Sequence, residues 1–94
     1  MPVEPKRCTI AGRHVLSLEL FYDEIARQLD FPAYFGRNLD ALYDFLSTDL
    51  EGPLEMVWQD SLVSLTAMGD DFQRVREVLE SVASERDDFV IVFP

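Results

Sequence analysis

The sequence predicts an α/β fold in which a three-stranded parallel β-sheet is packed by about four helices. Short apolar runs typical of strands alternate along the chain with segments whose apolar residues recur at helical spacing. Strands separated by helices run parallel through right-handed crossovers, so a single parallel sheet is the most economical arrangement. With 94 residues, 48% of them hydrophobic, the chain can build one core, and residues 1–94 are expected to form a single domain.

The first half of the chain contains one expected strand and two expected helices. Residues 8–11 form the strand, Gly12 lies in the turn after it, and residues 1–6 before it are expected to be flexible. Ser17 is a good N-cap for the first helix, which Pro32 ends, and Asn38 is a good N-cap for the second. The apolar stripes of these helices are Leu18, Phe21, Ile25 and Leu29, and Leu39, Leu42, Tyr43 and Leu46.

The second half contains two expected strands and one long helix. After Gly52 and Pro53, residues 54–58 form a strand and residues 62–65 a short helical turn. Residues 89–93 are five consecutive apolar residues, a run typical of a strand that is buried on both faces, either in the middle of a parallel sheet or as an enclosed strand. Between them, the long helix is indicated by the spacing of Phe72, Val75, Val78, Leu79 and Val82.

Charge is the most unusual property of the composition. The 18 Asp and Glu residues outnumber 8 Lys and Arg, which gives a net charge of −10 and a pI near 4.2. This surface argues against direct binding to nucleic acid or an anionic membrane and favours a cationic partner, although acidity alone fits a solubility role equally well. Residues 38–73 contain no Lys or Arg and hold eight acids: Asp40, Asp44, Asp49, Glu51, Glu55, Asp60, Asp70 and Asp71.

Cysteine content and hydropathy indicate the compartment. The single cysteine, Cys8, cannot form an internal disulfide, and it is expected to be a small buried residue of the first strand. The chain shows neither the apolar region of a signal peptide nor a stretch of about 20 apolar residues that could span a membrane. The protein is therefore expected in the cytoplasm.

The segment from Tyr34 to Leu46 carries the strongest functional signal. Asp40 and Asp44 project side by side next to the apolar stripe of the second helix. The helix dipole stabilises Asp40 in the first turn, but it offers no such reason for Asp44, which favours a binding role there. Gly36 is expected to adopt a positive φ before the cap. Of the adjacent Tyr34 and Phe35, one is expected in the core and the other on the surface as an interface anchor.

This segment closely resembles the barstar family, which are intracellular inhibitors of secreted bacterial ribonucleases. The shared pattern, Pro-x-Tyr-aromatic-Gly-x-Asn-Leu-Asp-Ala-Leu-aromatic-Asp-x-Leu, runs from Pro32 to Leu46, and the likeness continues over nearly the whole chain. The resemblance implies a barstar-like fold and a monomer that binds one cationic nuclease. Its second helix and preceding loop would cover the nuclease active site, with Asp44 in the place of a substrate phosphate. The expected partner-binding residues are Tyr34, Phe35, Gly36, Asn38, Asp40, Tyr43, Asp44, Asp49, Glu51 and Glu85.

Two positions depart from the family pattern at its contacts. Asp49 stands where barstar has a tryptophan, and Ser81 stands where barstar has a glutamate that touches the enzyme. The nearby Glu77, Glu80 and Glu85 could replace that glutamate, although plain solvation explains such a mixed-charge helix face better. The departures suggest a target different from barstar's own.

Other classes of function are less well supported. A hydrolase could use Asp40 and Asp44 as an acid and base pair, but an exposed helix face argues against the raised pKa that such a pair needs. His14, the only histidine, has no nucleophile motif beside it, and no cofactor, metal or catalytic residue is expected. A small acidic module that binds another protein remains an alternative. A self-associating protein would need Met56 or Trp58 on its surface, and both are expected in the core.

Overall fold

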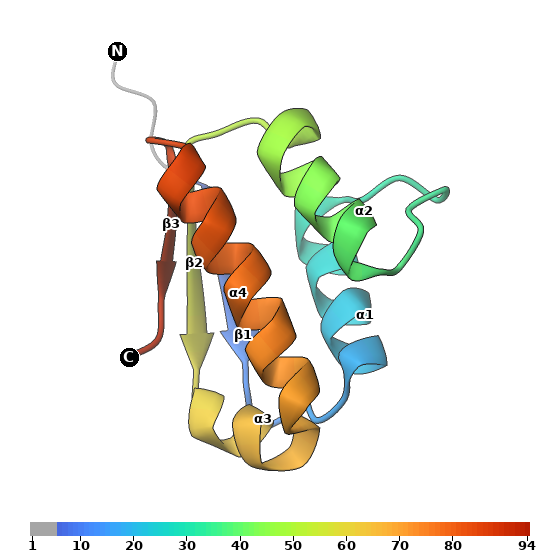
Figure 1. The fold of residues 1–94 in the computed structure, drawn as a ribbon, viewed down its shortest axis with the longest axis vertical. Coiled ribbons are helices and arrows are strands. Elements are labelled where there is room, and N and C mark those ends of the chain that lie inside the picture. Colours follow the sequence, from blue (N-terminus) through green and yellow to red (C-terminus); the bar gives the residue numbers. More distant parts are fainter. Residues whose placement is uncertain (1–5) are drawn as a thin grey trace.

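The computed structural model describes residues 6–94, and its elements follow the alternation expected from the sequence (Figure 1). Residues 1–5, most of the segment expected to be flexible, lie outside the described residues, and Lys6 begins the first strand. The elements in order are β1 (Lys6–Ala11), α1 (Leu18–Leu29), α2 (Leu39–Asp44), the π-helical turn η1 (Phe45–Asp49), β2 (Leu54–Gln59), α3 (Ser61–Met68), α4 (Asp70–Glu85) and β3 (Phe89–Val92).

The three strands form one parallel sheet in the order β1-β2-β3, which confirms the predicted fold class. Lys6 pairs with Leu54, and Leu54 pairs in turn with Phe89. The prediction that the last strand is buried on both faces is wrong, because β2 is central and β3 is an edge. Phe89 is buried in β3, whereas Val90 is 50% exposed. The residues of this edge strand that face outward are valines. The sequence is therefore apolar throughout, although only one face of the strand is buried.

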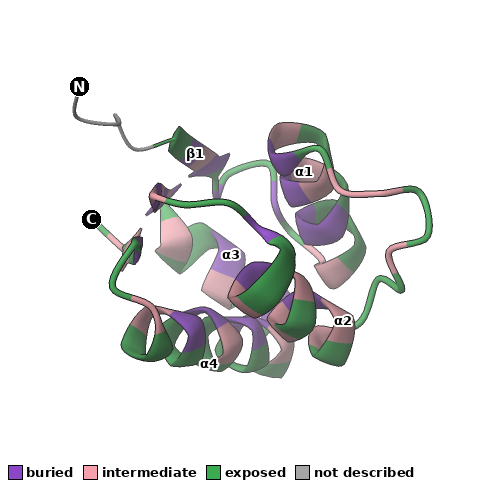
Figure 2. Cartoon of the chain, turned by 90° about the horizontal axis from the view of Figure 1, so that it is seen from above, coloured by how far each residue is buried: buried purple, intermediate pink, exposed green. Residues whose placement is uncertain are grey.

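The helices lie on one side of the sheet, as two views at right angles show (Figures 1 and 2). Along β2, residues alternate between buried and partly exposed, with Leu54, Met56 and Trp58 facing the helices. Alternation of this kind is what one covered face of a sheet requires.

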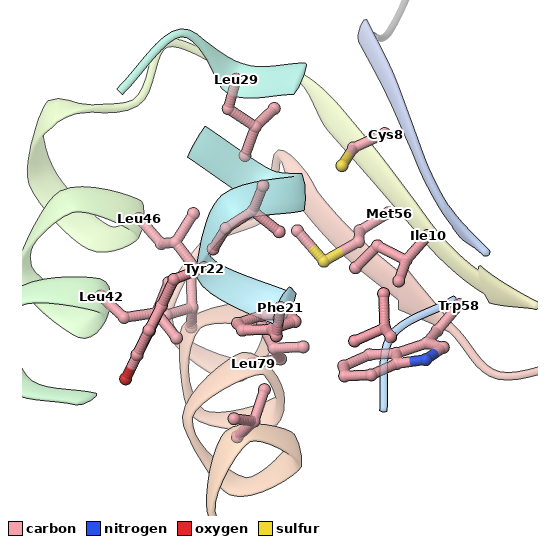
Figure 3. Packing of buried hydrophobic residues seen from close by; sticks show 14 of the residues in the cluster. Cys8, Ile10, Phe21, Tyr22, Leu29, Leu42, Leu46, Met56, Trp58 and Leu79 are labelled. Atoms are coloured by element: carbon pink, nitrogen blue, oxygen red, sulfur yellow. The ribbon is translucent and has the colours of Figure 1, made fainter. Parts of the chain in front are cut away.

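The core lies between the sheet and α1, α2 and α4 (Figure 3). Trp58 and Met56 are fully buried, as expected, and the Trp58 ring stacks on Phe21 with 5.1 Å between ring centroids. Trp58 Nε1 donates a 3.0 Å hydrogen bond to Ser64 Oγ, which donates in turn to the carbonyl oxygen of Gly12 at 2.9 Å. The indole is thus packed and hydrogen-bonded at once, as a buried tryptophan needs.

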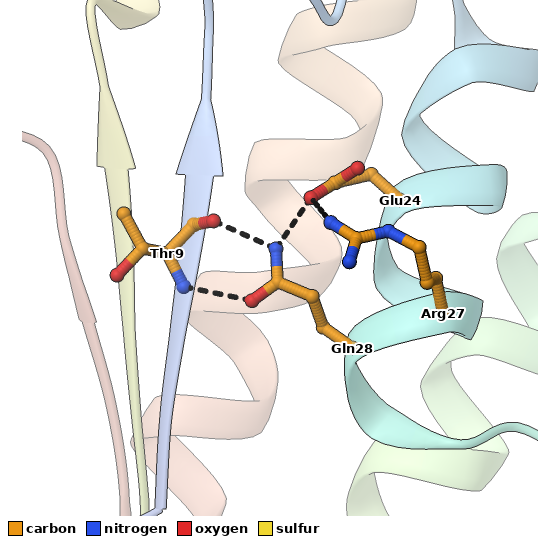
Figure 4. Close-up of polar contacts among 4 residues, drawn as sticks. All are labelled: Thr9, Glu24, Arg27 and Gln28. Carbon is orange, nitrogen blue, oxygen red and sulfur yellow. Dashed lines mark hydrogen bonds and ion pairs between the residues drawn. The ribbon is translucent and has the colours of Figure 1, made fainter.

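The outer edge of β1 is covered by a side chain of α1 (Figure 4). Gln28 Oε1 accepts from the backbone N–H of Thr9 at 3.1 Å, and Gln28 Nε2 donates to the Thr9 carbonyl oxygen at 2.7 Å. Glu24 Oε1 orients the amide, accepting from Gln28 Nε2 at 2.6 Å and from Arg27 at 2.5 Å. The side-chain amide pairs with the strand as a neighbouring strand would, and this protects an otherwise open edge.

The helix caps agree with the sequence-based predictions more closely than the helix lengths do. Ser17 Oγ accepts from Leu20 N–H at 3.2 Å and caps α1, as predicted. The expected short turn at residues 62–65 is a longer helix, α3, which spans Ser61–Met68. Its periodicity is blurred because Leu62 and Val63 lie on its exposed side at 71% and 40% exposure.

Candidate functional site

In the loop before α2, the two adjacent aromatic residues Tyr34 and Phe35 point to different environments. Tyr34 is 87% exposed, whereas Phe35 packs edge-on against Phe31 and Tyr22 at centroid distances of 4.7 and 5.8 Å. This confirms that one ring belongs to the core and the other to the surface. Phe35 anchors the loop, and Tyr34 is left free for contact with a partner.

The backbone of this loop differs from the prediction at one residue. The positive φ expected at Gly36 lies instead at Arg37, with φ 50°. Gly36 is required for a different reason: its carbonyl oxygen accepts from Asn38 Nδ2 at 3.1 Å, and a Cβ at residue 36 would lie only 3.0 Å from that nitrogen. The glycine allows a close approach and not a left-handed backbone.

Asn38 links the loop to α2. Its Oδ1 accepts from the backbone N–H of Ala41 at 2.8 Å, which confirms the predicted N-cap, while its Nδ2 holds the Gly36 carbonyl. One side chain therefore fixes both the start of the helix and the turn before it. The consequence is a set orientation of the loop relative to Asp40 and Asp44.

The helix that begins at Asn38 ends in the π-helical turn η1, which the sequence analysis missed. The N–H of Leu50 donates to the carbonyl oxygen of Phe45 at 2.9 Å, an i→i−5 bond. The hydroxyls of Ser47 and Thr48 donate to the carbonyl oxygens of Tyr43 and Asp44, each at 2.6 Å. These side chains support the wider turn, in which residues five apart come close to alignment. Asp49 is five residues after Asp44.

Asp44 and Asp49 line one hollow of about 180 Å³, here called the loop hollow. Both side chains are exposed, and within residues 6–94 neither forms an ion pair with Lys, Arg or His. The other residues around the loop hollow are apolar, aromatic or small: Pro32, Tyr34, Phe35, Gly36, Ala41 and Phe45. Two carboxylates without an ion-pair partner among the described residues thus share a hollow with largely apolar walls, and Asp49 Oδ1 accepts only a 3.3 Å hydrogen bond from its neighbour Thr48.

Asp40 opens on a different hollow, although it lies one helical turn from Asp44. This groove between α2 and α4 has a volume of about 330 Å³ and also holds Glu77, which sequence reasoning had assigned to plain solvation. Ser81, where the resemblance implies a glutamate in barstar, lines the same groove. The remaining lining residues are Leu39, Tyr43, Arg74 and Val78.

Glu85 reaches the site through Tyr43. The Tyr43 hydroxyl donates a hydrogen bond to the Glu85 carboxylate, and this bond, more than any other influence, raises the pKa of Tyr43 above its ordinary value. The contact ties α2 to the C-terminal part of α4. Glu85 is therefore engaged within the protein, whereas Glu77 faces the groove.

Glu51 lies beside the loop hollow and not in it. It lines a third hollow of about 420 Å³, together with Lys6, Asp30 and Asp49. Asp49 lines both this hollow and the loop hollow and so joins them. The predicted partner-binding residues thus fall on one stretch, which comprises the loop, α2, η1 and the segment after η1 that holds Glu51, plus Glu85 from α4.

Within residues 6–94, no group of three or more His, Cys, Asp or Glu side chains is arranged to hold a metal ion. His14 is exposed in the turn after β1. In the same part of the chain, no helix is long and apolar enough to cross a membrane.

Comparisons with known proteins identify the family of the chain. The family described as "Barstar (barnase inhibitor)" matches residues 6–94. A protein of Bacillus subtilis (strain 168) named "Putative ribonuclease inhibitor YrdF" is 36% identical over 88 residues, covering 93% of this chain and 97% of that protein. The match includes the loop, α2, η1 and α4, the elements that form the site. The chain belongs to the barstar family.

Proposed function

We propose that this protein inhibits a basic ribonuclease or a related nuclease by covering its active site. The observation that carries the proposal is the loop hollow, in which the exposed carboxylates of Asp44 and Asp49, which form no ion pair within residues 6–94, lie between aromatic and apolar walls. Family membership and the name of the Bacillus subtilis relative point to ribonuclease inhibition in general. The roles of the individual residues are the proposal made here.

The chemistry of the hollow suits the active site of a ribonuclease. Such an enzyme stabilises a dianionic phosphorane with Arg, Lys or His, so its cleft is a preformed anion site. Asp44 would take the place of the substrate phosphate, and Asp49 would supply a second carboxylate. A planar guanidinium pairs well with carboxylates and packs well on aromatic rings, and both are present in the loop hollow.

The groove between α2 and α4 provides a second contact. Asp40 and Glu77 line it from opposite helices, and Tyr43 is another of its lining residues. Glu77 is on α4 one turn before Ser81, so it supplies a carboxylate near the position of the glutamate lost there. A second cationic side chain of the nuclease would bind in this groove.

The acidic field of the site would act before contact is made. Residues 38–73 carry eight acids and no Lys or Arg, and this charge would steer a basic partner and raise its association rate. The protein would act in the cytoplasm as a monomer and bind one molecule of a nuclease that the cell secretes. No bond is made or broken, so the protein itself would not be an enzyme.

The alternative partners use the same surface. A small acidic module that binds a different basic protein would rely on the same carboxylates, and only the identity of the captured protein separates the two. The carboxylate-dependent hydrolase is disfavoured because Asp40 and Asp44 line separate, exposed hollows. An acid and base pair must flank one substrate bond.

Inhibition of ribonuclease activity by matched variants tests the proposal. Basic proteins are fractionated from the culture medium and lysate of the producing cells, and RNA hydrolysis is measured with the wild type, Asp44→Ala and Asp70→Ala. Asp70 belongs to the same base-free span but lies in the first turn of α4, so its variant controls for the loss of one charge. The wild type and Asp70→Ala should abolish activity in one fraction, whereas Asp44→Ala should need about 30-fold more protein.

Two results would contradict the proposal. One is that the wild type inhibits no ribonuclease fraction at any concentration. The other is that Asp44→Ala inhibits as well as Asp70→Ala, which would remove Asp44 from its role. If the purified protein hydrolyses a substrate alone and Asp40→Asn abolishes that activity, the hydrolase alternative is correct instead.

A further inference from the structure

Arg37 fastens the loop before α2 to the first helix. Its Nη2 donates to Asp23 Oδ1 at 2.8 Å and to the backbone carbonyl oxygen of Glu19 at 3.2 Å. The guanidinium carbon lies 5.7 Å from the centroid of the Tyr22 ring. Glu19, Tyr22 and Asp23 lie within about one turn of α1, so a single side chain from the loop contacts all three.

The backbone at Arg37 makes these contacts necessary. Its φ of 50° is a left-handed conformation that glycine adopts easily and arginine does not. A residue held in this region persists only when the surroundings compensate the strain. The bonds to Asp23 and Glu19 and the contact with the Tyr22 ring can offset this strain.

A positive charge at Arg37 is unexpected on a surface that is proposed to bind a basic partner. Arg37 lies between Gly36, which lines the loop hollow, and the base-free span that begins at Asn38. A free cation here would repel a basic partner. The ion pair with Asp23 turns this charge toward α1 and away from the role of a partner contact.

We propose that Arg37 is a positioning residue that holds the loop before α2, with Tyr34 and Gly36, in the conformation that binds the partner. The inference rests on the proposed function for its partner, but the clamp itself is a property of the free protein. A loop that is already ordered loses less conformational entropy on association, which strengthens binding without a new contact.

Hydrogen exchange in the free protein tests the clamp without any partner. The N–H of Phe35 donates to the Pro32 carbonyl oxygen at 3.0 Å and reports on the loop, and the N–H of Ala41 reports on the cap. Arg37→Ala and Asp23→Ala should each speed exchange at Phe35 by about 10-fold, while Arg37→Lys should retain part of the protection. Arg13→Ala, which removes another exposed arginine with an ion pair, should leave Phe35 unchanged. Unchanged exchange in Arg37→Ala would overturn the inference.

Arg37→Gly separates the clamp from the backbone strain. Glycine accepts φ 50° without strain but makes no contact with α1. If the clamp orders the loop, exchange at Phe35 should rise in Arg37→Gly as it does in Arg37→Ala. If exchange stays at the wild-type rate, the backbone conformation alone orders the loop, and the inference is wrong.

Affinity for the nuclease is a second measurement, and for it a positioning role and a purely electrostatic role of Arg37 predict opposite changes. The probe is the ribonuclease fraction that the wild type inhibits. A clamp predicts that Arg37→Ala binds about 10-fold more weakly and that adding Asp23→Ala weakens binding little further, since both remove the same contact. A purely electrostatic role predicts tighter binding when the cation is removed, and that result would contradict the positioning role. If the wild type inhibits no ribonuclease, the proposed function fails, while exchange at Phe35 still decides whether the clamp exists.

Discussion

The guanidinium of Arg86 donates a 2.6 Å hydrogen bond to the backbone carbonyl oxygen of Leu46, a residue 40 positions earlier in the chain. The same nitrogen donates to the carbonyl oxygen of Leu50 at 2.9 Å, and the rest of the guanidinium pairs with Asp88. The two carbonyls belong to η1 and the residue after it. The residue that follows α4 therefore holds the end of the helix that carries Asp44 and Asp49.

Arg86→Ala should destabilise the protein by about 2 kcal/mol. The change removes two charge-assisted hydrogen bonds and leaves the carbonyls of Leu46 and Leu50 without that donor. The side chain of Arg86 is only 15% exposed, so water replaces it poorly. The midpoint of urea unfolding, followed by the fluorescence of the buried Trp58, measures the loss.

Arg13→Ala is the matched control for that measurement. Arg13 also loses a carboxylate partner, Asp60, but its side chain is 74% exposed, so the cost should stay below about 1 kcal/mol. Equal destabilisation by the two changes would mean that the bonds to η1 contribute nothing beyond a surface ion pair.

The ion pair of Arg86 with Asp88 predicts a dependence of stability on acid pH. The hydrogen bond from Arg86 holds the pKa of Asp88 below its ordinary value. The folded state thus binds the Asp88 proton less readily than the unfolded state, so the pair stabilises the protein above the ordinary aspartate pKa. This contribution is lost as the pH falls through the lowered pKa. In Asp88→Asn, the free energy of unfolding should decline less than in the wild type between about pH 5 and about pH 2, the range over which aspartate titrates. An identical decline in both proteins would contradict the assignment.

Gln28→Ala should open the outer edge of β1. The amide of Gln28 makes both backbone hydrogen bonds of Thr9, and their loss should cost about 1 kcal/mol and promote association through the exposed strand. Gln73→Ala is the control, because Gln73 is an exposed residue of α4. Urea unfolding and light scattering at rising protein concentration measure the two effects. The edge is not protected by Gln28 if the two variants behave alike.

Cys8 should be unreactive in the folded protein. The thiol is fully buried, and burial raises its pKa to about 11. At pH 8 the thiolate is therefore scarce as well as inaccessible. Labelling with a disulfide reagent should be slow in buffer and complete within minutes in urea, and rapid labelling of the native protein would show that β1 opens easily.

Local signals in the sequence were sufficient for the two predicted caps and the strands, and for the division of Tyr34 and Phe35 into one core ring and one surface ring, but not for which ring is which. Ser17 and Asn38 act on residues within three positions, so their roles are readable from neighbours. The order of the strands is not local. The edge position of β3 could not be read from five apolar residues, because valine on an open sheet face looks the same as valine in a core.

The missed features of the site depend on contacts between distant residues. Arg37 meets Asp23 and Glu19, which lie 14 and 18 positions earlier, and nothing near Arg37 in the sequence indicates them. The π-helical turn was missed because Leu39, Leu42 and Leu46 fit ordinary helical spacing. Ser47 and Thr48, whose hydroxyls support the turn, were the available signal. Asp49 was singled out from the sequence, but only η1 explains how it comes to line the same hollow as Asp44.

Competition for the phosphate site of the ribonuclease tests the central claim most directly. The apparent dissociation constant of the protein for its ribonuclease is measured by calorimetric titration, with and without a saturating nucleotide 3′-phosphate. If Asp44 occupies the phosphate site, the apparent constant should rise in proportion to the nucleotide concentration. An affinity that is unchanged by the nucleotide would show that the protein binds elsewhere on the enzyme and would contradict the account.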